Sequence, residues 1–314
     1  MTIANATSRP LAVIGNVNVD LILGPATPWP KAGTEIIVDH DELRVGGQAG
    51  NSALVWKALG VDYAIAANVG NDQFGRWLAE TFGSHGAAWP VSAENTTLSV
   101  GITHPDGERT FFTTRGHLPR FSLADVLAVL DGEKLRGGYA LLTAAFLTDD
   151  LTRDYEALFD WADGHQITVA LDTGWPLDGW TEANCEATRQ WLSRCGIALF
   201  NEIETTTLAG IADPVEAASD LRSHMPEGAI FVVKRGPEGA VAIVADSGLV
   251  SVPAPRVKVI DTIGAGDVFN AAFLAALARG EPIEACLAAG TAVASRAIST
   301  LPRSYGGVQS EEVR

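Results

Sequence analysis

Short apolar runs alternate with longer helical segments through most of the chain, and this alternation constrains the fold more than any other feature. The runs YALLT, ITVAL, IALF and IFVVK begin at residues 139, 167, 197 and 230, and segments with helical periodicity separate them. Connections of this length join parallel strands, which are apolar throughout because helices cover both faces of their sheet. We therefore predict an α/β fold around a mainly parallel central sheet.

A segment of β-type sequence interrupts this alternation. LSVGIT at 98–103 and RTFFTT at 109–114 flank HPDGE, and a Pro-Asp-Gly turn between two such runs predicts a hairpin. We expect the hairpin to pair with strands near 18–45, among them the run EIIV. Residues 18–45 and 97–117 would then form a small β-sheet that acts as a lid on a single domain spanning residues 1–314.

The composition describes a compact, acidic protein. Hydrophobic residues make up 47% and charged residues 19% of the 314 residues, and 38 acidic against 22 basic residues give a net charge of −16. Only five of the basic residues are lysines, and no Lys/Arg run occurs, so the charge pattern of a nucleic-acid-binding protein is missing. Cys185, Cys195 and Cys286 have no spacing typical of a zinc site and suit a reducing compartment.

No segment is typical of an export signal or a membrane anchor. The first twenty residues hold one arginine and an apolar run of only about five residues, which is too short for a signal peptide. The longest apolar run, Val268–Ala278, contains Asn270 and falls well short of the roughly 20 residues that a spanning helix needs. We expect this run to be a core helix, and we expect the chain to lie in the cytoplasm with no membrane partner.

Polar residues follow the predicted parallel strands at the point where each strand ends. These are Asp172 after ITVAL, Asn201 and Glu204 after IALF, and Lys234 after IFVV. Parallel α/β proteins bind ligands beyond the carboxyl ends of their strands, so we expect a cleft there. Each residue alone is more often a helix cap or a turn residue. Their recurrence at several strand ends favours a binding site.

One stretch, residues 257–280, passes from an apolar run through glycines into a helix. Its sequence is VKVIDTIGAGDVFNAAFLAALARG, and we interpret the first four residues as the end of a strand. Gly264, Ala265 and Gly266 are small enough to let backbone N–H groups approach an anion, which the amino end of a helix also favours. Asp267 beside them has two interpretations: a helix N-cap, or a general base next to an anion site.

Several common catalytic signatures are absent from the sequence. The dipeptide Gly-Lys does not occur, so there is no Walker A loop, and neither H-E-x-x-H nor G-x-S-x-G is present. GAGDVF resembles the start of a dinucleotide-binding fingerprint, but Phe269 stands where the third glycine belongs and only 50 residues follow Gly264. An NAD-dependent oxidoreductase is therefore a minor alternative.

The glycine stretch and several other motifs resemble those of the ribokinase-like, or pfkB, carbohydrate kinases. DTIGAGDVFNAAF at 261–273 and GGQAGNSALVWKALG at 46–60 are similar to the two signatures of this family. Five shorter matches support them: GNVNVD at 15–20, GNDQFG at 70–75, DGERTFF at 106–112, NEIE at 201–204 and KRGPEG at 234–239. The resemblance spans nearly the whole chain and implies a ribokinase-like three-layer α/β/α sandwich.

The resemblance also implies a role for each matching residue. Asp267 would take the proton from the acceptor hydroxyl, and the amides of Gly264, Ala265 and Gly266 would form an anion hole. The residues implied to hold the sugar are Asn18, Asp20, Gly46, Gly47 and Asn51. Those implied to bind ATP are Asn201, Glu204, Lys234, Gly236 and Gly239, with Glu204 holding Mg²⁺ through water. The residues at positions that bind a monovalent cation such as K⁺ in many relatives are Asp261 and Ile263.

The chain departs from ribokinases proper at several positions. Gln48 stands where a lysine is common, and YALLTAAF at 139–146 lacks the acidic residue placed near there, which puts ribose in doubt as the acceptor. SRAIST at 295–300 lacks the glycine that the cation loop usually includes. Three further residues either face the sugar or are ordinary lid and cleft residues: Arg115, His117 and Trp175.

We predict an enzyme that transfers the γ-phosphoryl group of ATP to a primary hydroxyl of a sugar or sugar-like molecule. A nucleoside kinase of the same fold stays open, because the fold does not fix the acceptor. Outside the enzymes, the alternative is a non-catalytic sugar-binding relative. A small exposed sheet has unpaired edges and often an apolar face that need cover, so we also expect a homodimer through the lid.

Overall fold

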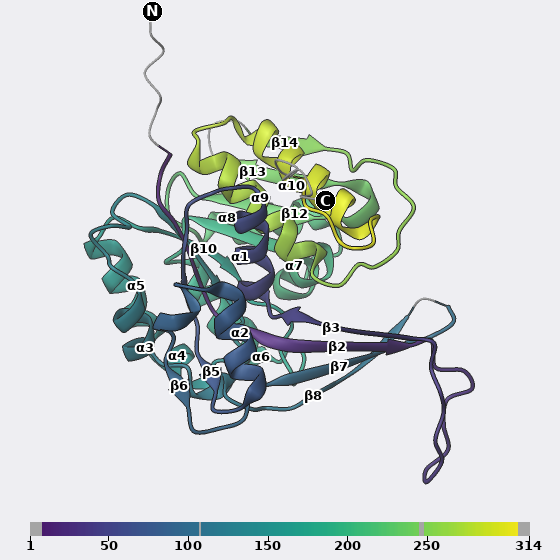
Figure 1. Ribbon diagram of the computed structural model, residues 1–314. Helices are drawn as coiled ribbons and strands as arrows, with labels where there is room; N and C mark the ends of the chain where they lie inside the picture. The colour runs from purple at the N-terminus through teal and green to yellow at the C-terminus, as the bar shows by residue number, and fades with distance from the viewer. Residues whose placement is uncertain (1–7, 107, 245–247, 307–314) are drawn as a thin grey trace, which may run out of the picture.

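The computed structural model describes residues 8–106, 108–244 and 248–306. Within these residues an eight-stranded sheet has the order β14-β13-β12-β11-β10-β9-β1-β4 (Figure 1). Its strands are β1 (Leu11–Ile14), β4 (Ala64–Ala66), β9 (Tyr139–Thr143), β10 (Thr168–Asp172), β11 (Ile197–Asn201), β12 (Ile230–Lys234), β13 (Ala240–Val244) and β14 (Gly248–Val252). Neighbours from β12 to β4 pair in parallel, while β13 and β14 form an antiparallel edge. The predicted mainly parallel sheet is confirmed.

Helices cover both faces of this sheet, which gives the molecule three layers (Figure 1). In β1, Leu11 and Val13 pack into the core on one face, while Ala12 and Ile14 pack into the core on the other. The first core includes residues of α1 (Gln48–Ala58), α2 (Gln73–Phe82), α9 (Ala265–Ala278) and α10 (Ile283–Ile298). The second includes residues of α3 (Leu123–Val129), α4 (Asp149–Arg153), α5 (Tyr155–Gly164), α6 (Glu182–Leu192), α7 (Glu202–Ala209) and α8 (Pro214–Ser223). Burial on both faces explains why the strands are continuously apolar.

Helix α9 lies inside the first core rather than on its surface. Its buried side chains include Val268, Phe273 and Leu274, and the Trp56 Nε1 of α1 donates a hydrogen bond to the Ala271 carbonyl over 2.8 Å. The predicted core helix is therefore confirmed. Among the described residues, no helix is long and apolar enough to span a membrane.

A second, smaller sheet projects from the main body (Figure 1). Its order is β3-β2-β7-β8, with bounds β2 (Asn18–Gly24), β3 (His40–Gly46), β7 (Leu98–Thr103) and β8 (Arg109–Thr113). β7 and β8 pair antiparallel and β7 pairs with β2, so the predicted hairpin and its pairing are confirmed. Gly107, in the predicted turn, lies outside the described residues. We call this element the small sheet.

Short elements connect the larger ones. β5 (Val69–Gly70) and β6 (Val91–Ser92) pair with each other in parallel. Three short 3₁₀ helices are Gly86–Ala88, Leu118–Arg120 and Gly236–Glu238.

Two predicted strands are wrong. Residues 35–38 and 257–260 have no strand structure, and Ile37, Val259 and Ile260 are largely exposed. The Ile260 amide instead donates to the carbonyl of Ile298 at the end of α10. The chain after β14 thus leaves the edge of the large sheet and does not add a strand to it.

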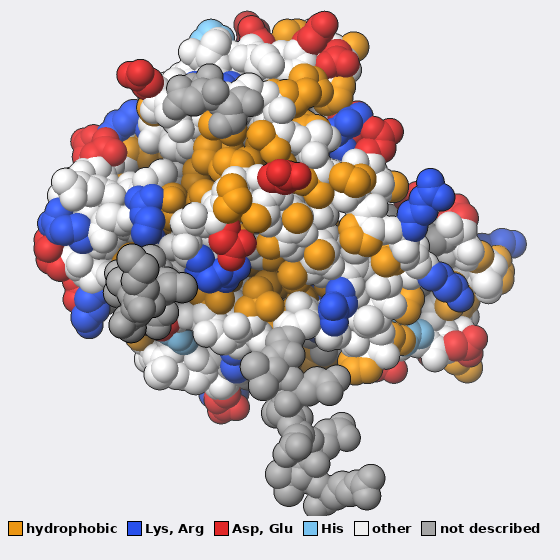
Figure 2. Space-filling model, turned by 90° about the horizontal axis from the view of Figure 1, so that it is seen from above, with side chains coloured by type: hydrophobic (Ala, Val, Ile, Leu, Met, Phe, Trp, Pro, Cys, Tyr) orange, Lys and Arg blue, Asp and Glu red, His pale blue; other side chains and the backbone are white. Residues whose placement is uncertain are grey.

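The end of the molecule that lies uppermost in Figure 1 carries a hollow with many hydrophobic side chains (Figure 2). A cavity of about 640 Å³ lies beside the amino end of β1, and its lining includes Leu11, Leu59, Tyr63 and Ala275. The predicted site residues lie at the opposite, carboxyl ends of the parallel strands, and none of them lines this cavity.

Candidate active site

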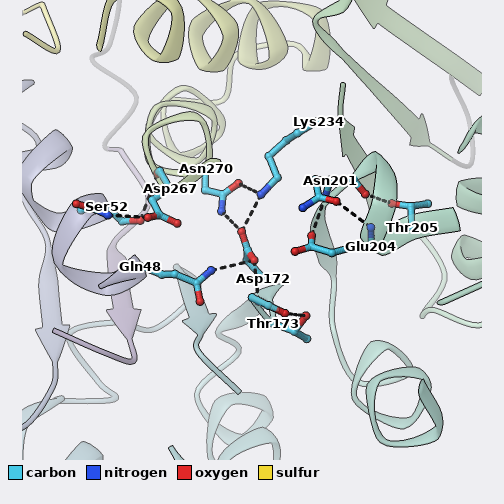
Figure 3. Close-up of polar contacts among 12 residues, drawn as sticks. Gln48, Ser52, Asp172, Thr173, Asn201, Glu204, Thr205, Lys234, Asp267 and Asn270 are labelled. Carbon is cyan, nitrogen blue, oxygen red and sulfur yellow. Dashed lines mark hydrogen bonds and ion pairs between the residues drawn. The ribbon is translucent and has the colours of Figure 1, made fainter. Parts of the chain in front are cut away.

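Three adjacent strands of the large sheet end in polar residues that lie side by side. Asp172 ends β10, Asn201 ends β11, and Lys234 ends β12 opposite Asn201 in the ladder. The Lys234 Nζ donates to Asp172 Oδ2 over 2.7 Å, and Asn270 Nδ2 of α9 donates to the same oxygen over 2.6 Å (Figure 3). Parallel pairing thus brings residues far apart in the sequence to one edge of the sheet.

The glycine loop brings the amino end of α9 to the same place. Gly264 is the N-cap, with a left-handed φ of 70°, and no side chain caps the helix. The N-cap interpretation of Asp267 is therefore wrong, because this residue lies in the first turn and its Oδ2 accepts a hydrogen bond from Asn51 Nδ2 over 2.8 Å. A Cβ atom on Gly264 would lie 2.7 Å from that same Asn51 nitrogen.

Backbone amides and one lysine surround the space in front of this loop. The Ala265 amide already donates to the Thr262 carbonyl over 3.1 Å, whereas the first amides inside a helix have no partner within it. A Cβ atom on Gly266 would lie 3.3 Å from Lys234 Nζ. The glycine therefore permits the ammonium group to lie directly against the helix amino end, where both favour an anion.

Buried carboxylates give the site unusual ionisation behaviour. Burial raises the pKa of Asp267 to about 7, the negative charge of Asp172 adds to this, and the Asn51 hydrogen bond opposes it. Burial and Asp172 likewise raise the pKa of Glu204 to about 7. Burial also opposes ionisation of Asp172, but the adjacent Lys234 ammonium outweighs it and holds that pKa below its usual value.

Asn201 and Glu204 form a capping box at the amino end of α7. The Glu204 amide donates to Asn201 Oδ1, and the Asn201 amide donates to Glu204 Oε2, each over 2.8 Å. In Figure 3 the carboxyl group of Glu204 faces the same space as Asp172. Asn201 and Glu204 thus stabilise the beginning of α7, and this role uses one of the two carboxylate oxygens of Glu204.

Asn18 and Asp20 lie on one face of β2 in the small sheet. The Asn18 Nδ2 donates to Asp20 Oδ1 over 2.8 Å, and burial raises the pKa of Asp20 to about 6. A Cβ atom on Gly46 would come within 2.1 Å of Asp20 Oδ1, and one on Gly47 within 2.4 Å of the Asn16 carbonyl. The two glycines of the amino-terminal motif therefore allow these polar groups to pack against the backbone.

Gly236 begins the short helix between β12 and β13 and Gly239 follows it, and both have positive φ. Nothing lies within 4 Å of a Cβ atom built on Gly236, whereas one on Gly239 would lie 2.0 Å from the Val252 carbonyl. Gly239 is thus needed for the close packing of the chain against β14, whereas the space beside Gly236 is empty.

The predicted cation position is surrounded by arginines. Asp261 Oδ2 accepts from Arg44 over 2.6 Å and from Arg303 over 2.8 Å, while its Oδ1 accepts from Arg109 over 2.9 Å and from the Ile263 amide over 2.9 Å. A carboxylate has about four acceptor positions, and four donors occupy them here. The Asp261 carboxylate therefore has no acceptor position left for K⁺.

Arg115, His117 and Trp175, which the sequence offers as either sugar-facing or ordinary lid and cleft residues, have different environments. His117 is fully buried, its Nδ1 accepts from the Thr97 amide, and burial lowers its pKa to about 4. Arg115 is exposed and pairs with Asp149, and Trp175 is half exposed. His117 is thus part of the structure that joins the small sheet to the body.

Known proteins identify the family of the chain. The sequence profile of the pfkB family carbohydrate kinases matches residues 8–302. The chain belongs to the pfkB carbohydrate kinase family. This pfkB kinase is a phosphotransferase with an alcohol acceptor, and its similarity to curated kinases extends over most of its length.

The relatives of this pfkB kinase are distant. Ribokinase of Bacillus subtilis is 26% identical over 303 residues, covering 95% of this chain and 94% of its own. A 1-phosphofructokinase of Haloferax volcanii is 27% identical over 263 residues, covering 83% and 81%. Among solved structures, Arabidopsis thaliana ribokinase complexed with ribose and ATP has a TM-score of 0.74 at 22% identity, with 93% of each chain covered. A probable sugar kinase of Rhizobium etli has a TM-score of 0.78 at 23% identity, covering 96% and 97%. These structures show the ribokinase-like fold.

Sequence reasoning missed part of this arrangement. In the sequence Asn270 is only a polar residue within an apolar helix, yet its side chain forms hydrogen bonds with both Asp172 and Lys234. Gln48 also reaches Asp172, with its Nε2 donating to Oδ1 over 3.0 Å. A polar residue inside an otherwise apolar core helix is the one signal that points to Asn270.

Proposed function

We propose that this pfkB kinase transfers the γ-phosphoryl group of ATP to a primary hydroxyl of a sugar, with Asp267 as the general base. The carrying observation is the position of Asp267: buried, held by Asn51, and in the first turn of α9 next to the glycine loop and Lys234. A pKa near 7 suits a base at neutral pH, because about half of the groups are then ionised and the carboxylate is basic enough to accept a proton.

The chemistry demands mainly alignment and charge stabilisation. Asp267 removes the hydroxyl proton as the oxygen attacks, and the Asn51 hydrogen bond fixes which carboxylate oxygen faces the acceptor. Lys234 and the helix amino end stabilise the negative charge of the transferred group. Asp172 and Asn270 orient Lys234, since both accept from its ammonium group.

The remaining motif residues form two groups, one for binding the acceptor and one for binding the nucleotide. We propose that the acceptor hydroxyls bind Asn18, Asp20, Gly46, Gly47 and Asn51. We propose that ATP binds along Asn201, Glu204, Lys234, Gly236 and Gly239. One free carboxylate oxygen of Glu204, with phosphate oxygens and water, suits Mg²⁺, which would neutralise phosphate charge when bound.

We further propose that residues 1–314 form a single domain in which the small sheet acts as a lid. Asn18 and Asp20 lie on this sheet, while Asp267 lies on the body. A lid that carries sugar-binding residues would complete the site only when it lies over the acceptor, and it would exclude water that otherwise hydrolyses ATP.

The test is ADP release from ATP and Mg²⁺ with a panel of sugars, sugar acids, sugar phosphates and nucleosides. The proposal expects turnover with a sugar or sugar derivative. Turnover with nucleosides alone would favour a nucleoside kinase of the same fold. Thermal stabilisation by sugars without any ADP release would instead favour a sugar-binding protein without catalysis, and would contradict the proposal.

A further inference from the structure

Three arginines from distant segments meet at one carboxylate. Arg44 comes from β3, Arg109 from β8, and Arg303 from the segment after α10, and each donates to Asp261 over 2.6 to 2.9 Å. Their side chains are only 15 to 18% exposed. We call Arg44, Arg109 and Arg303 the arginine cluster.

Some hydrogen-bond donors of the cluster have no partner. Besides Asp261, Glu42 lies 3.7 Å from Arg44 Nη1, and the charges of Arg44 and Arg303 also act on Asp20, so three guanidinium groups face three carboxylates. Two of the arginine nitrogens, Arg44 Nη2 and Arg109 Nε, are nevertheless buried and have no hydrogen-bond partner among the described residues. Buried polar groups normally have partners, so these two donors need an explanation.

The cluster lies on the acceptor side of the site. Arg44 stands directly opposite Asp20 in the β2–β3 ladder, so both side chains are on the same face of the small sheet. Arg109 stands opposite Thr103, which is on the same face as Ser99, the partner of Asp20 on β7. Asp261, which holds the cluster, begins the loop that leads to Asp267. The cluster therefore joins the sugar-binding face to the base's loop.

We propose that the acceptor of this kinase is an anionic sugar derivative, whose carboxylate or phosphate group is bound by the arginine cluster through Arg44. A guanidinium group binds both anions in a bidentate manner. Asp261 holds the three side chains in place before the acceptor arrives, which lowers the entropic cost of binding. This inference rests on the proposed function, since it names the acceptor of the same site.

One departure from ribokinases fits this acceptor class. The segment 139–146 lacks their acidic residue, and its Ala144 amide donates to Gln48 Oε1 over 3.0 Å. The absence of this negative group favours an anionic acceptor. The second departure, Gln48 in place of a common lysine, removes a positive group, so the anion would depend on the arginine cluster.

The cluster could instead serve only to hold the small sheet against the body. A purely structural latch would act on every acceptor alike, whereas an anion-binding group acts on charged acceptors only. The two roles therefore differ in how one arginine substitution affects a charged acceptor and its neutral parent.

The experiment compares matched acceptors in the wild type and in Arg44→Gln. Each sugar is assayed with its aldonic acid and its monophosphate, so that the two arms separate carboxylate from phosphate. We expect one anionic series to exceed its neutral parents in kcat/KM. Arg44→Gln should raise KM for that series about 10- to 100-fold, the cost of one charge-assisted contact, with the neutral parents changed less than about threefold. Arg153→Gln, an exposed arginine paired with Asp150 on α4, is the matched control.

Results that contradict the anionic acceptor can be told apart from results that contradict the kinase reaction. Neutral sugars that react as well as both anions, or an Arg44→Gln variant whose kcat falls equally for all acceptors, would overturn the anionic acceptor while leaving a kinase. If no acceptor releases ADP, thermal shifts decide. Anions that raise Tm in the wild type and not in Arg44→Gln would support the anion site without the reaction, and anions with no Arg44-dependent effect would refute it.

Discussion

Burial disfavours the charge of Asp267, and the negative charge of Asp172 adds to this effect. The pKa of Asp267 is about 7 in the folded protein against 3.8 for an ordinary aspartate, so the folded state binds its proton more tightly than the unfolded chain. The stability that this residue contributes is therefore present below about pH 4 and is lost as the pH rises through about 7. A residue that weakens the fold at its working pH is typical of a functional site.

Asp267→Asn should consequently stabilise the protein at alkaline pH. Asparagine keeps the shape and removes the buried charge, so we expect the free energy of unfolding to rise by on the order of 2 kcal/mol at pH 8. That gain should appear as a Tm several degrees above the wild type at pH 8. Melting curves measured again near pH 4.5 should show little difference. A lower Tm for the variant at pH 8 would mean that the native carboxylate is well compensated.

The same pKa predicts the pH dependence of the reaction. The base must be ionised, so kcat/KM for the acceptor should rise with unit slope below about pH 7 and level off above it. Glu204 has a similar pKa, and initial rates of Glu204→Gln between pH 5.5 and 9 separate the two. The ascending limb should persist in that variant. Its loss there would assign the limb to Glu204.

The beginning of α9 depends on a glycine at Gly264. Its φ of 70° is unfavourable for other residues, and a Cβ atom would also press on Asn51. Gly280, at the other end of α9, has a φ of 77° but open space around it, so Gly280→Ala measures the backbone strain alone, about 1 kcal/mol.

Gly264→Ala should be more damaging than this control. We expect a larger loss of stability in urea unfolding and, because Asn51 must move from Asp267, a loss of kcat of at least about tenfold. Gly280→Ala should keep the wild-type kcat. Equal effects of the two substitutions on kcat would show that the Asn51 contact is not important.

The elements that sequence patterns predicted correctly are those whose environment is simple. Parallel strands such as β10 to β12 are apolar except at their ends, and the β7–β8 hairpin has strong turn residues. Residues 35–38 and 257–260 are similarly apolar but pair with no described strand, and a local pattern does not reveal whether a segment has a partner strand. The contacts of Asp267 likewise depend on Asn51, 216 residues away.

The composition of the site was more predictable than its connections. Motif residues such as Asp267, Asn51 and Lys234 do lie together. The arginine cluster had no sequence signal as a group, because its members are far apart and only Arg109 lies in a motif. Only the three-dimensional fold reveals that these charges meet at Asp261.

At the scale of the whole molecule, the small sheet leaves one apolar face uncovered. On the face opposite Asp20's, Val19 and Val45 are buried, but six further apolar side chains, which lie in register across the four strands, are not. They are Leu21, Leu23, Leu43, Val100, Ile102 and Phe112. A contiguous apolar face of this kind usually marks an interface, and a second copy of the chain offers the same face by twofold symmetry.

A homodimer through this face is therefore expected at micromolar concentration. Leu43→Asp and Phe112→Asp place a charge on the face and should convert the dimer to a folded monomer in light scattering, because an unpaired charge opposes burial. Leu127→Asp on α3, a leucine of similar exposure, is the control and should remain dimeric. A monomeric wild type would contradict this arrangement.

The central claim is that Asp267 is the base of a sugar-kinase reaction, and Asp267→Asn measured for both turnover and ATP binding tests it most directly. The account predicts that kcat with the acceptor found by the substrate panel falls by about 100- to 10,000-fold, while the ATP dissociation constant stays within about threefold of the wild type. Turnover within about tenfold of the wild type would contradict the assignment of Asp267 as the base.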